Sequence, residues 1–207
     1  MITIVDYGVG NIQALLNIYD HLGIDAQASC EPQVIAEAQS LLLPGVGAFD
    51  KAMCALNDRC LIPALEHAVH KRCVPILGIC LGMQLLARSS TEGKLSGLGW
   101  IAADVKRIEV VHDSGLKVPH MGWRDICPTR TSTLLSAKEV EKYYFVHSYH
   151  VVCDDQNDVI ATVDYGIKLC CAINRKNIWG VQFHPEKSHA YGMRLLKAFS
   201  ELNCDDE

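Results

Sequence analysis

The first half of the chain alternates between short apolar runs and stretches in which apolar residues recur at helical spacing. Three of the apolar runs are typical of buried strands and lie at residues 2–6, 41–43 and 74–79. Helical spacing after the first run predicts a helix that begins after Asn11, a favourable N-cap residue, and ends before Gly23, a favourable residue just beyond a helix. This strand, turn and helix form the first unit of the predicted fold.

Further helices are predicted between and after the later strands. Residues 52–72 are mostly helical in pattern with an interruption near Pro63, and residues 81–87 continue as a helix directly after a strand. Strands that alternate with helices in this way usually pair in parallel and carry helices on both faces of the sheet. We therefore expect an open, mostly parallel α/β sheet flanked by helices.

The pattern changes from about Gly97, and the C-terminal half is rich in strands. Strand-like runs separated by loop residues lie at residues 108–111, 143–146, 150–153, 159–163, 169–174 and 178–183. Residues 191–202 then predict an amphipathic helix with Met193, Leu196 and Phe199 on one side. Residues 204–207 are expected to form a frayed acidic tail.

Composition favours a single α/β domain over residues 1–207. Hydrophobic residues make up 49% of the chain, which is enough for a sizeable core, and no apolar run is long enough to span a bilayer. The chain has 19 basic and 24 acidic residues, so its net charge is −5. This charge argues against a nucleic-acid surface, which would normally be basic, and against a polybasic membrane anchor.

The chain contains ten cysteines, an unusual number for its length. The N-terminus has neither the basic segment nor the small-residue cleavage site of a signal peptide, so we expect a cytoplasmic chain with reduced thiols. Zinc sites use cysteine pairs separated by two to four residues, and no two cysteines of this sequence are so spaced. The spacing therefore predicts no zinc site, and most of the cysteines are expected to be small core or surface residues; nothing in the sequence implies another metal or an organic cofactor.

One cysteine lies in a motif that carries chemistry. Residues 78–82 read Gly-Ile-Cys-Leu-Gly between an apolar strand and a helix, which is the cysteine form of the nucleophile elbow Gly-x-Ser-x-Gly. Such a turn presents Cys80 at the C-terminal edge of the sheet and at a helix N-terminus, whose partial positive charge favours a thiolate. The backbone N–H of Leu81 then points to where an oxyanion would form. A buried cysteine in a glycine-rich turn is the alternative interpretation.

A second motif offers a base for this cysteine. Residues 184–186 read His-Pro-Glu directly after the last predicted strand. Because Pro185 favours extended geometry at His184, the side chains of His184 and Glu186 are expected on one face. The carboxylate would then bond to one ring nitrogen while the other nitrogen faces a nucleophile. Taken alone, the motif would be no more than a polar segment that follows a strand. Together with Cys80, it would supply the base and the orienting carboxylate of a triad.

Other segments carry weaker signals. Residues 6–11 read Asp-Tyr-Gly-Val-Gly-Asn and lack the fuller pattern of a dinucleotide or phosphate loop. Residues 44–47 form either an ordinary turn or the source of a second N–H for an oxyanion hole. Residues 147–150 either wall a pocket or are structural, and His120, Trp100 and Trp123 carry no specific signal.

Together these segments resemble the class I (triad) glutamine amidotransferases over essentially the whole length of the chain. The elbow continues as Met83-Gln84 and is joined by the distant His-Pro-Glu motif. Within that family the sequence is most similar to glutaminase subunits of imidazole glycerol phosphate synthase. The supporting segments are residues 6–11, 43–49, 119–123, 144–149 and 184–188.

The resemblance implies a reaction and a role for each site residue. Cys80 would attack the side-chain amide carbon of L-glutamine, His184 would accept the thiol proton and later protonate departing ammonia, and Glu186 would hold the imidazole. A γ-glutamyl thioester would then be hydrolysed to glutamate. The positions that match oxyanion-binding or glutamine-binding residues are Val46, Gly47, Leu81, Gln84, Ser148 and Tyr149.

The resemblance also implies a partner. A glutaminase of this kind needs nearly all 207 residues, so we expect a separate synthase subunit that receives ammonia through a protected path. In the resembled enzyme this partner is a (β/α)8-barrel cyclase of histidine biosynthesis. Asn11, Tyr144 and Lys187 match positions that face the partner.

Some residues depart from the histidine-pathway pattern and leave the acceptor open. Arg124 stands where that family usually has Asn, and Ile108 stands where Phe is common. Residues 97–101 and 187–193 are closer to paralogues from bacterial surface-polysaccharide clusters, which supply ammonia to a sugar amidotransferase. The alternatives are therefore such a paralogue, a stand-alone cysteine hydrolase of a γ-glutamyl substrate, or a non-catalytic binding module on the same fold.

Overall fold

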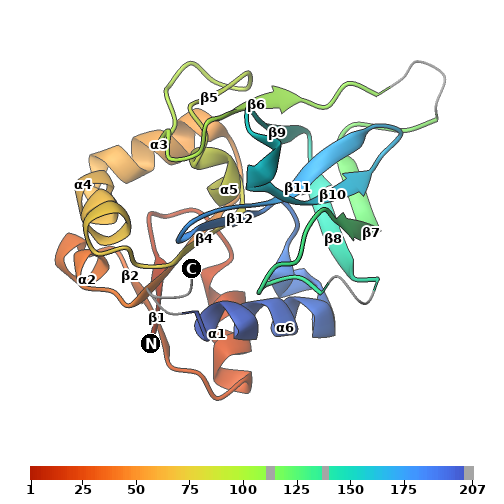
Figure 1. The fold of residues 1–207 in the computed structure, drawn as a ribbon. Coiled ribbons are helices and arrows are strands. Elements are labelled where there is room, and N and C mark those ends of the chain that lie inside the picture. Colours follow the sequence, from red (N-terminus) through yellow and green to blue (C-terminus); the bar gives the residue numbers. More distant parts are fainter. Residues whose placement is uncertain (111–114, 137–139, 203–207) are drawn as a thin grey trace.

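A nine-stranded sheet runs through the part of the chain that the computed structural model describes, residues 1–110, 115–136 and 140–202 (Figure 1). The strands in their order across the sheet are β2 (Ala26–Ser29), β1 (Ile2–Val5), β3 (Ser40–Gly45), β4 (Ile76–Cys80), β12 (Ile178–Val181), β11 (Lys168–Arg175), β10 (Val159–Asp164), β7 (His120–Pro128) and β8 (Lys142–His147).

The sheet has a parallel half and an antiparallel half, which meet at β12. Neighbouring strands from β2 to β12 pair in parallel. Neighbouring strands from β12 to β8 pair antiparallel. The parallel half is built from the strand–helix units, and the antiparallel half from the strand-rich second part of the chain. The predicted α/β class with helices on the sheet and a β-rich C-terminal half is confirmed, but the sheet is mixed and not mostly parallel, because the strands of the second half join the same sheet.

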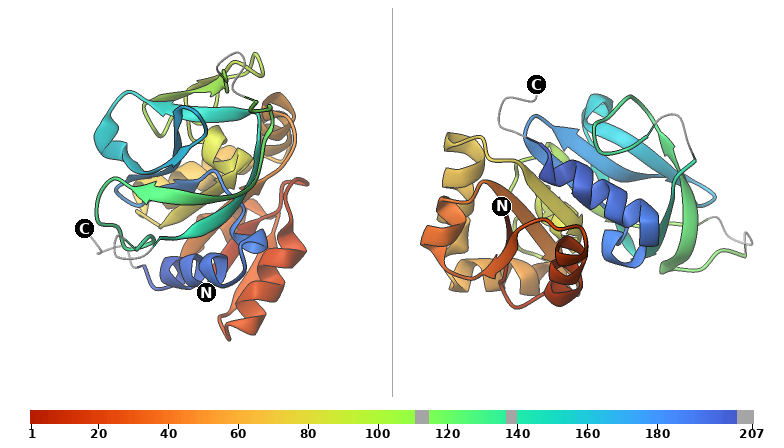
Figure 2. Two further views of the ribbon diagram at one scale, coloured as in Figure 1. Left: turned by 90° about the vertical axis from the view of Figure 1, so that its right-hand side faces the viewer. Right: turned by 90° about the horizontal axis from the view of Figure 1, so that it is seen from below.

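Helices cover both faces of the sheet (Figure 2). One face carries α1 (Ile12–His21) and α6 (His189–Ser200). The other face carries α2 (Pro32–Ala36), α3 (Phe49–Asp58), α4 (Leu61–Glu66), the π-helical turn η1 (His67–Lys71) and α5 (Leu81–Leu85). Alternate residues of β3 show the two cores: Leu42 packs with the α1 and α6 side, whereas Leu41 and Leu43 pack with the other helices.

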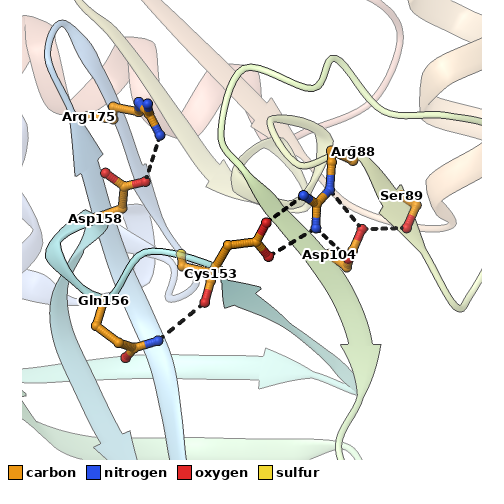
Figure 3. A network of polar contacts seen from close by, with 8 residues as sticks. Arg88, Ser89, Asp104, Cys153, Gln156, Asp158 and Arg175 are labelled. Carbon is orange, nitrogen blue, oxygen red and sulfur yellow. Dashed lines mark hydrogen bonds and ion pairs between the residues drawn. The ribbon is translucent and has the colours of Figure 1, made fainter.

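A small three-stranded sheet packs beside α5 and consists of β5 (Ser89–Ser90), β6 (Ala103–Arg107) and β9 (Tyr149–Cys153). Figure 3 shows the polar network at its edge. Arg88 binds Asp104 at 2.7 Å and Asp154 at 2.6 Å, and the Ser89 hydroxyl donates to Asp104 at 2.8 Å. The Arg88 and Ser89 hydrogen bonds lower the pKa of Asp104. The network joins the segment after α5 to β6 and to the end of β9.

The helices predicted in the first half of the chain are present, and the structure differs from the prediction only in local detail. The interruption predicted near Pro63 lies three residues earlier, at Cys60, where φ is +54°. Pro63 lies in the first turn of α4, where a missing backbone N–H costs nothing. α1 begins directly after Asn11 as predicted, although the Asn11 side chain makes no capping hydrogen bond. Gly23, with φ +66°, lies just beyond that helix as predicted.

In the second half of the chain, the prediction of a strand at residues 108–111 is wrong, because residues 108–110 form no strand. The strand of that region is β6, which ends at Arg107, and Val111 lies outside the described residues. The predicted C-terminal helix is confirmed as α6, with Leu196 and Phe199 buried and Met193 half-buried. The predicted acidic tail at residues 204–207 lies outside the described residues.

Two further features of the described residues concern disulfide bonds and membrane-spanning helices. Nine of the ten cysteines lie in the described residues, and all nine are free thiols. The described chain contains no helix with the length and apolar character needed to cross a bilayer.

Candidate active site

Cys80 ends β4 in a strained backbone conformation that opens directly into α5. Its φ of +56° and ψ of −108° fall where residues with a side chain are rare. Gly82, the last residue of the elbow, permits the sharp turn, because a Cβ at this position would lie 1.7 Å from the carbonyl oxygen of Leu43. A Cβ on Gly78 would likewise lie 2.7 Å from the carbonyl oxygen of Gly82. The geometry predicted for the elbow is confirmed.

β12 brings a histidine to the same edge of the sheet. It pairs in parallel with β4, with Val181 beside Ile79, and His184 follows three residues later. His184 is extended, with φ −101° and ψ 96°, as Pro185 predicts. Glu186 lies in the single turn η3 (Pro185–Lys187), and not in the extended chain that the sequence suggested. The turn nevertheless brings Glu186 Oε1 to 2.8 Å from His184 Nδ1, so the predicted pairing is confirmed.

The His184 imidazole sits between the thiol and the carboxylate, and all three groups are almost fully buried. Burial disfavours the charged ring, but its hydrogen bonds to Cys80 and Glu186 outweigh burial and raise the pKa of His184 to about 10. Because Glu186 occupies Nδ1, the nitrogen that faces Cys80 is Nε2. A protonated imidazole beside sulfur stabilises a thiolate, and such an arrangement can attack the carbon of an amide.

The loop after β3 lies beside Cys80. Gly45 pairs with Cys80 across the sheet, and the chain then continues into Val46, which is 44% exposed, and Gly47. The buried hydroxyl of Tyr7 donates a hydrogen bond to the carbonyl of Pro44 at 2.7 Å and so fixes the start of the loop. The segment from which a second oxyanion N–H was predicted therefore borders the thiol.

A cavity of about 400 Å³ opens over these groups. It brings together all six residues predicted for oxyanion or glutamine binding, and two of the three residues predicted for a triad, Cys80 and His184. The full lining is Val46, Gly47, Cys80, Leu81, Gln84, Glu92, Pro119, Val146, His147, Ser148, Tyr149, His184 and Lys187.

Glu92 also lines the cavity, although no sequence pattern predicts it there. Its carboxylate Oε2 accepts a hydrogen bond of 3.0 Å from the backbone N–H of Phe49, at the start of α3. Glu92 therefore ties the cavity wall to the helix that follows the loop after β3. It belongs to no motif, and its partner is 43 positions away in the sequence, so no local pattern signals this role.

His147 also lines the cavity and is held by a second histidine. Its Nδ1 lies 2.8 Å from the carbonyl of Tyr149, so Nδ1 carries the proton and Nε2 accepts from Nδ1 of His120, also at 2.8 Å. Burial lowers the pKa of His147 to about 3, and burial together with the charge of Arg124 lowers the pKa of His120 to about 4. The sequence left open whether this segment walls a pocket or is structural, and His147 does both.

The three residues predicted to face a partner do not all lie at the cavity. Lys187 lies at the cavity, with its Nζ 5.7 Å from the centre of the Tyr144 ring. Asn11 is exposed at the start of α1 and is not among the residues that line the cavity. Among the described residues, His, Cys, Asp and Glu side chains form no group of three or more that is placed to hold a metal ion.

Known proteins resemble this chain in both sequence and fold. A family model described as glutamine amidotransferase class-I matches residues 3–201. The chain is 47% identical over 204 residues to a Bdellovibrio bacteriovorus protein named imidazole glycerol phosphate synthase subunit HisH, with 98% of this chain and 100% of that protein covered. It is 45% identical over 203 residues to a Pseudomonas aeruginosa protein named imidazole glycerol phosphate synthase subunit HisH 2, with the same coverage.

The fold comparison agrees with the sequence matches. A solved structure described as a glutamine amidotransferase superposes with a TM-score of 0.74 at 17% identity, covering 96% of this chain and 97% of that one. At this identity the likeness concerns the fold alone. The family model spans nearly the whole chain, and the curated relatives are similar from end to end. On this evidence the chain belongs to the class-I glutamine amidotransferase family.

Proposed function

We propose that the chain is the glutaminase subunit of an imidazole glycerol phosphate synthase and hydrolyses L-glutamine to glutamate and ammonia. The observation that carries the proposal is the meeting of Cys80 and His184 at one cavity, with Glu186 hydrogen-bonded to the other ring nitrogen of His184. The end-to-end similarity to proteins that bear this subunit's name supports the choice of enzyme.

The first half of the reaction forms a thioester. Cys80 gives its proton to Nε2 of His184, and the sulfur attacks the side-chain amide carbon of glutamine. The amide oxygen becomes an oxyanion that accepts hydrogen bonds from the backbone N–H of Leu81 and from an N–H of residues 46–47. Removal of one such donor typically lowers the rate ~10²–10³-fold. The carbon–nitrogen bond then breaks, and His184 returns its proton to the departing ammonia.

The second half restores the cysteine. Water attacks the γ-glutamyl thioester carbon and passes a proton to His184, through a second oxyanion held by the same donors. The carbon–sulfur bond breaks, glutamate leaves, and the proton on His184 returns to Cys80. Glu186 keeps the imidazole in one orientation throughout, through its 2.8 Å hydrogen bond to Nδ1.

The cavity lining suits the polar end of glutamine. The Glu92 carboxylate complements an α-ammonium group, and Gln84 and the Ser148–Tyr149 segment add hydrogen-bonding groups to the lining. These groups would direct the side-chain amide of glutamine toward Cys80.

The ammonia acceptor is assigned to a synthase partner, for which the family resemblance implies a (β/α)8-barrel cyclase. Free ammonia is largely protonated in neutral water and would lose its nucleophilicity, so transfer inside a complex preserves it. The exposed Val46 and Lys187 at the cavity, with Tyr144 beside Lys187, support an interface on this side. Asn11 is assigned to the outer part of that interface.

The test is glutamate release by the purified chain, measured with and without the candidate cyclase. We expect slow hydrolysis alone and a large stimulation by the cyclase and its phosphorylated substrate. The Cys80→Ala variant should bind the cyclase but release no glutamate. High turnover without any partner would contradict the subunit assignment, and ammonia transfer to a sugar acceptor in place of the imidazole precursor would contradict the choice of synthase.

A further inference from the structure

Gln182 lies between β12 and His184, is fully buried, and reaches the sulfur of Cys80. Its side-chain Nε2 is 3.7 Å from Cys80 Sγ, within hydrogen-bond distance for sulfur, and its Oε1 accepts from Nε2 of Gln84 at 3.0 Å. A buried carboxamide needs partners at both ends, and these two bonds provide them. The side chain therefore contacts the atom that would attack glutamine.

The orientation of the Gln182 amide follows from a neighbouring carbonyl group. Nε2 of Gln84 also donates to the backbone carbonyl of Tyr149 at 3.1 Å. Because a carbonyl oxygen only accepts, the group of Gln84 that faces it must be the NH₂ group. The same NH₂ group faces Gln182, so Gln182 turns its oxygen toward Gln84 and its own NH₂ group toward Cys80.

We propose that Gln182 is a further catalytic residue, which donates a hydrogen bond to the Cys80 thiolate and stabilises it before the attack. The proposal rests on the glutaminase reaction proposed above. Hydrogen bonds to a charged acceptor are stronger than neutral ones, so the donor favours the thiolate over the thiol. Gln182 transfers no proton, because His184 is the group that accepts and returns the thiol proton. Gln84 lines the cavity, so the donor chain links the cavity wall to the nucleophile.

The test is the pH dependence of Cys80 alkylation by iodoacetamide in the full-length Gln182→Met variant. Only the thiolate reacts, so the measurement reports thiolate formation without requiring glutamine turnover. We expect the rate at neutral pH to fall about tenfold and its midpoint to rise by about one pH unit. Cleavage after Arg72 and Arg88 leaves Cys73 and Cys80 on one peptide, so fragment ions must assign the adduct to Cys80.

Two further variants separate a donor effect from a general loss of packing. Gln182→Glu keeps the shape and the acceptor for Gln84 but places negative charge beside the sulfur, so its midpoint should rise further. It also carries the test if the methionine variant does not fold. Gln156→Met removes a carboxamide that donates to the Cys153 carbonyl at 3.2 Å, away from the site, and should leave the profile unchanged (Figure 3).

An unmoved alkylation profile in both Gln182 variants would overturn the proposal, and so would an equal shift in Gln156→Met. Glutamine hydrolysis in the same variants provides the link to catalysis. We expect a lower kcat with little change in KM, and recovery of kcat at higher pH. If the wild-type chain alkylates as expected but never hydrolyses glutamine, the proposed function fails while the contact between Gln182 and the thiolate stands.

Discussion

His120, behind the cavity wall, should make the stability of the fold sensitive to acid. The side chain is fully buried, and the centre of its ring lies 4.1 Å from the centre of the Tyr165 ring and 4.8 Å from the centre of the Phe145 ring. Its Nε2 has no hydrogen-bond partner in the described part of the chain. Burial, helped by the charge of Arg124, lowers the pKa of His120 from 6.5 to about 4. Protonation of the folded protein at this position is therefore unfavourable.

The sign and the size of the effect follow from the two pKa values of His120. Between pH 4 and pH 6.5 the unfolded chain binds a proton that the folded chain does not, so stability decreases as the pH falls through this window. Above pH 6.5 neither state binds a proton at His120, so the folded protein loses no stability through this group. At pH 5, protonation of His120 in the unfolded chain lowers the free energy of unfolding by about 2 kcal/mol relative to its value above pH 6.5.

The perturbation is His120→Asn, which keeps a side-chain N–H near the position of Nδ1 but cannot titrate. Urea unfolding at pH 8 and pH 5 gives the free energy of unfolding of each protein. We expect the variant to be less stable than the wild type at pH 8 and to recover about 2 kcal/mol of that difference at pH 5. The exposed His67, changed to Asn, is the control and should show no such recovery. A His120→Asn difference that is the same at both pH values would refute the reasoning.

Three further predictions concern the elbow, the helix junction and the triad. Gly82→Ala places a methyl group 1.7 Å from a β3 carbonyl and should cost more than about 3 kcal/mol in thermal or urea unfolding, with loss of hydrolysis. Cys60→Gly relieves a left-handed backbone and should stabilise by about 0.5–1 kcal/mol, whereas Cys54→Gly inside α3 should destabilise by a similar amount. Equal effects of these two changes would contradict the strain argument. Glu186→Gln removes the carboxylate that orients His184 and should lower kcat for glutamine about 10²–10⁴-fold in a glutamate-release assay; unchanged kcat would exclude the triad.

Local sequence patterns predicted those parts of the site that depend on a turn or on neighbouring residues. The elbow around Cys80 follows from its flanking glycines, and the His184–Glu186 pair follows from their spacing of two. Predictions that depended on which residue adopts an unusual backbone were less successful. Pro63 was expected to interrupt the helix but fits its first turn, whereas Cys60 adopts the left-handed conformation without any sequence signal.

Residues positioned by long-range contacts were the ones that sequence reasoning missed. Glu92 enters the cavity because it bonds to a backbone N–H 43 residues earlier, and Gln182 reaches a sulfur atom 102 residues earlier. The strands β2 and β7 were also not predicted. β2 is only four residues long, and β7 has no regular alternation of buried and exposed residues. Their place in the sheet is determined by their neighbours more than by their own pattern.

The central claim is that Cys80 is the nucleophile of a glutamine-binding site. The most direct measurement is labelling with the diazoketone analogue of L-glutamine, followed by mass spectrometry of the digested protein. We expect one adduct, on Cys80, which excess L-glutamine prevents and which does not form in Cys80→Ala. An adduct on any other residue, or labelling of Cys80 that L-glutamine does not slow, would contradict the claim.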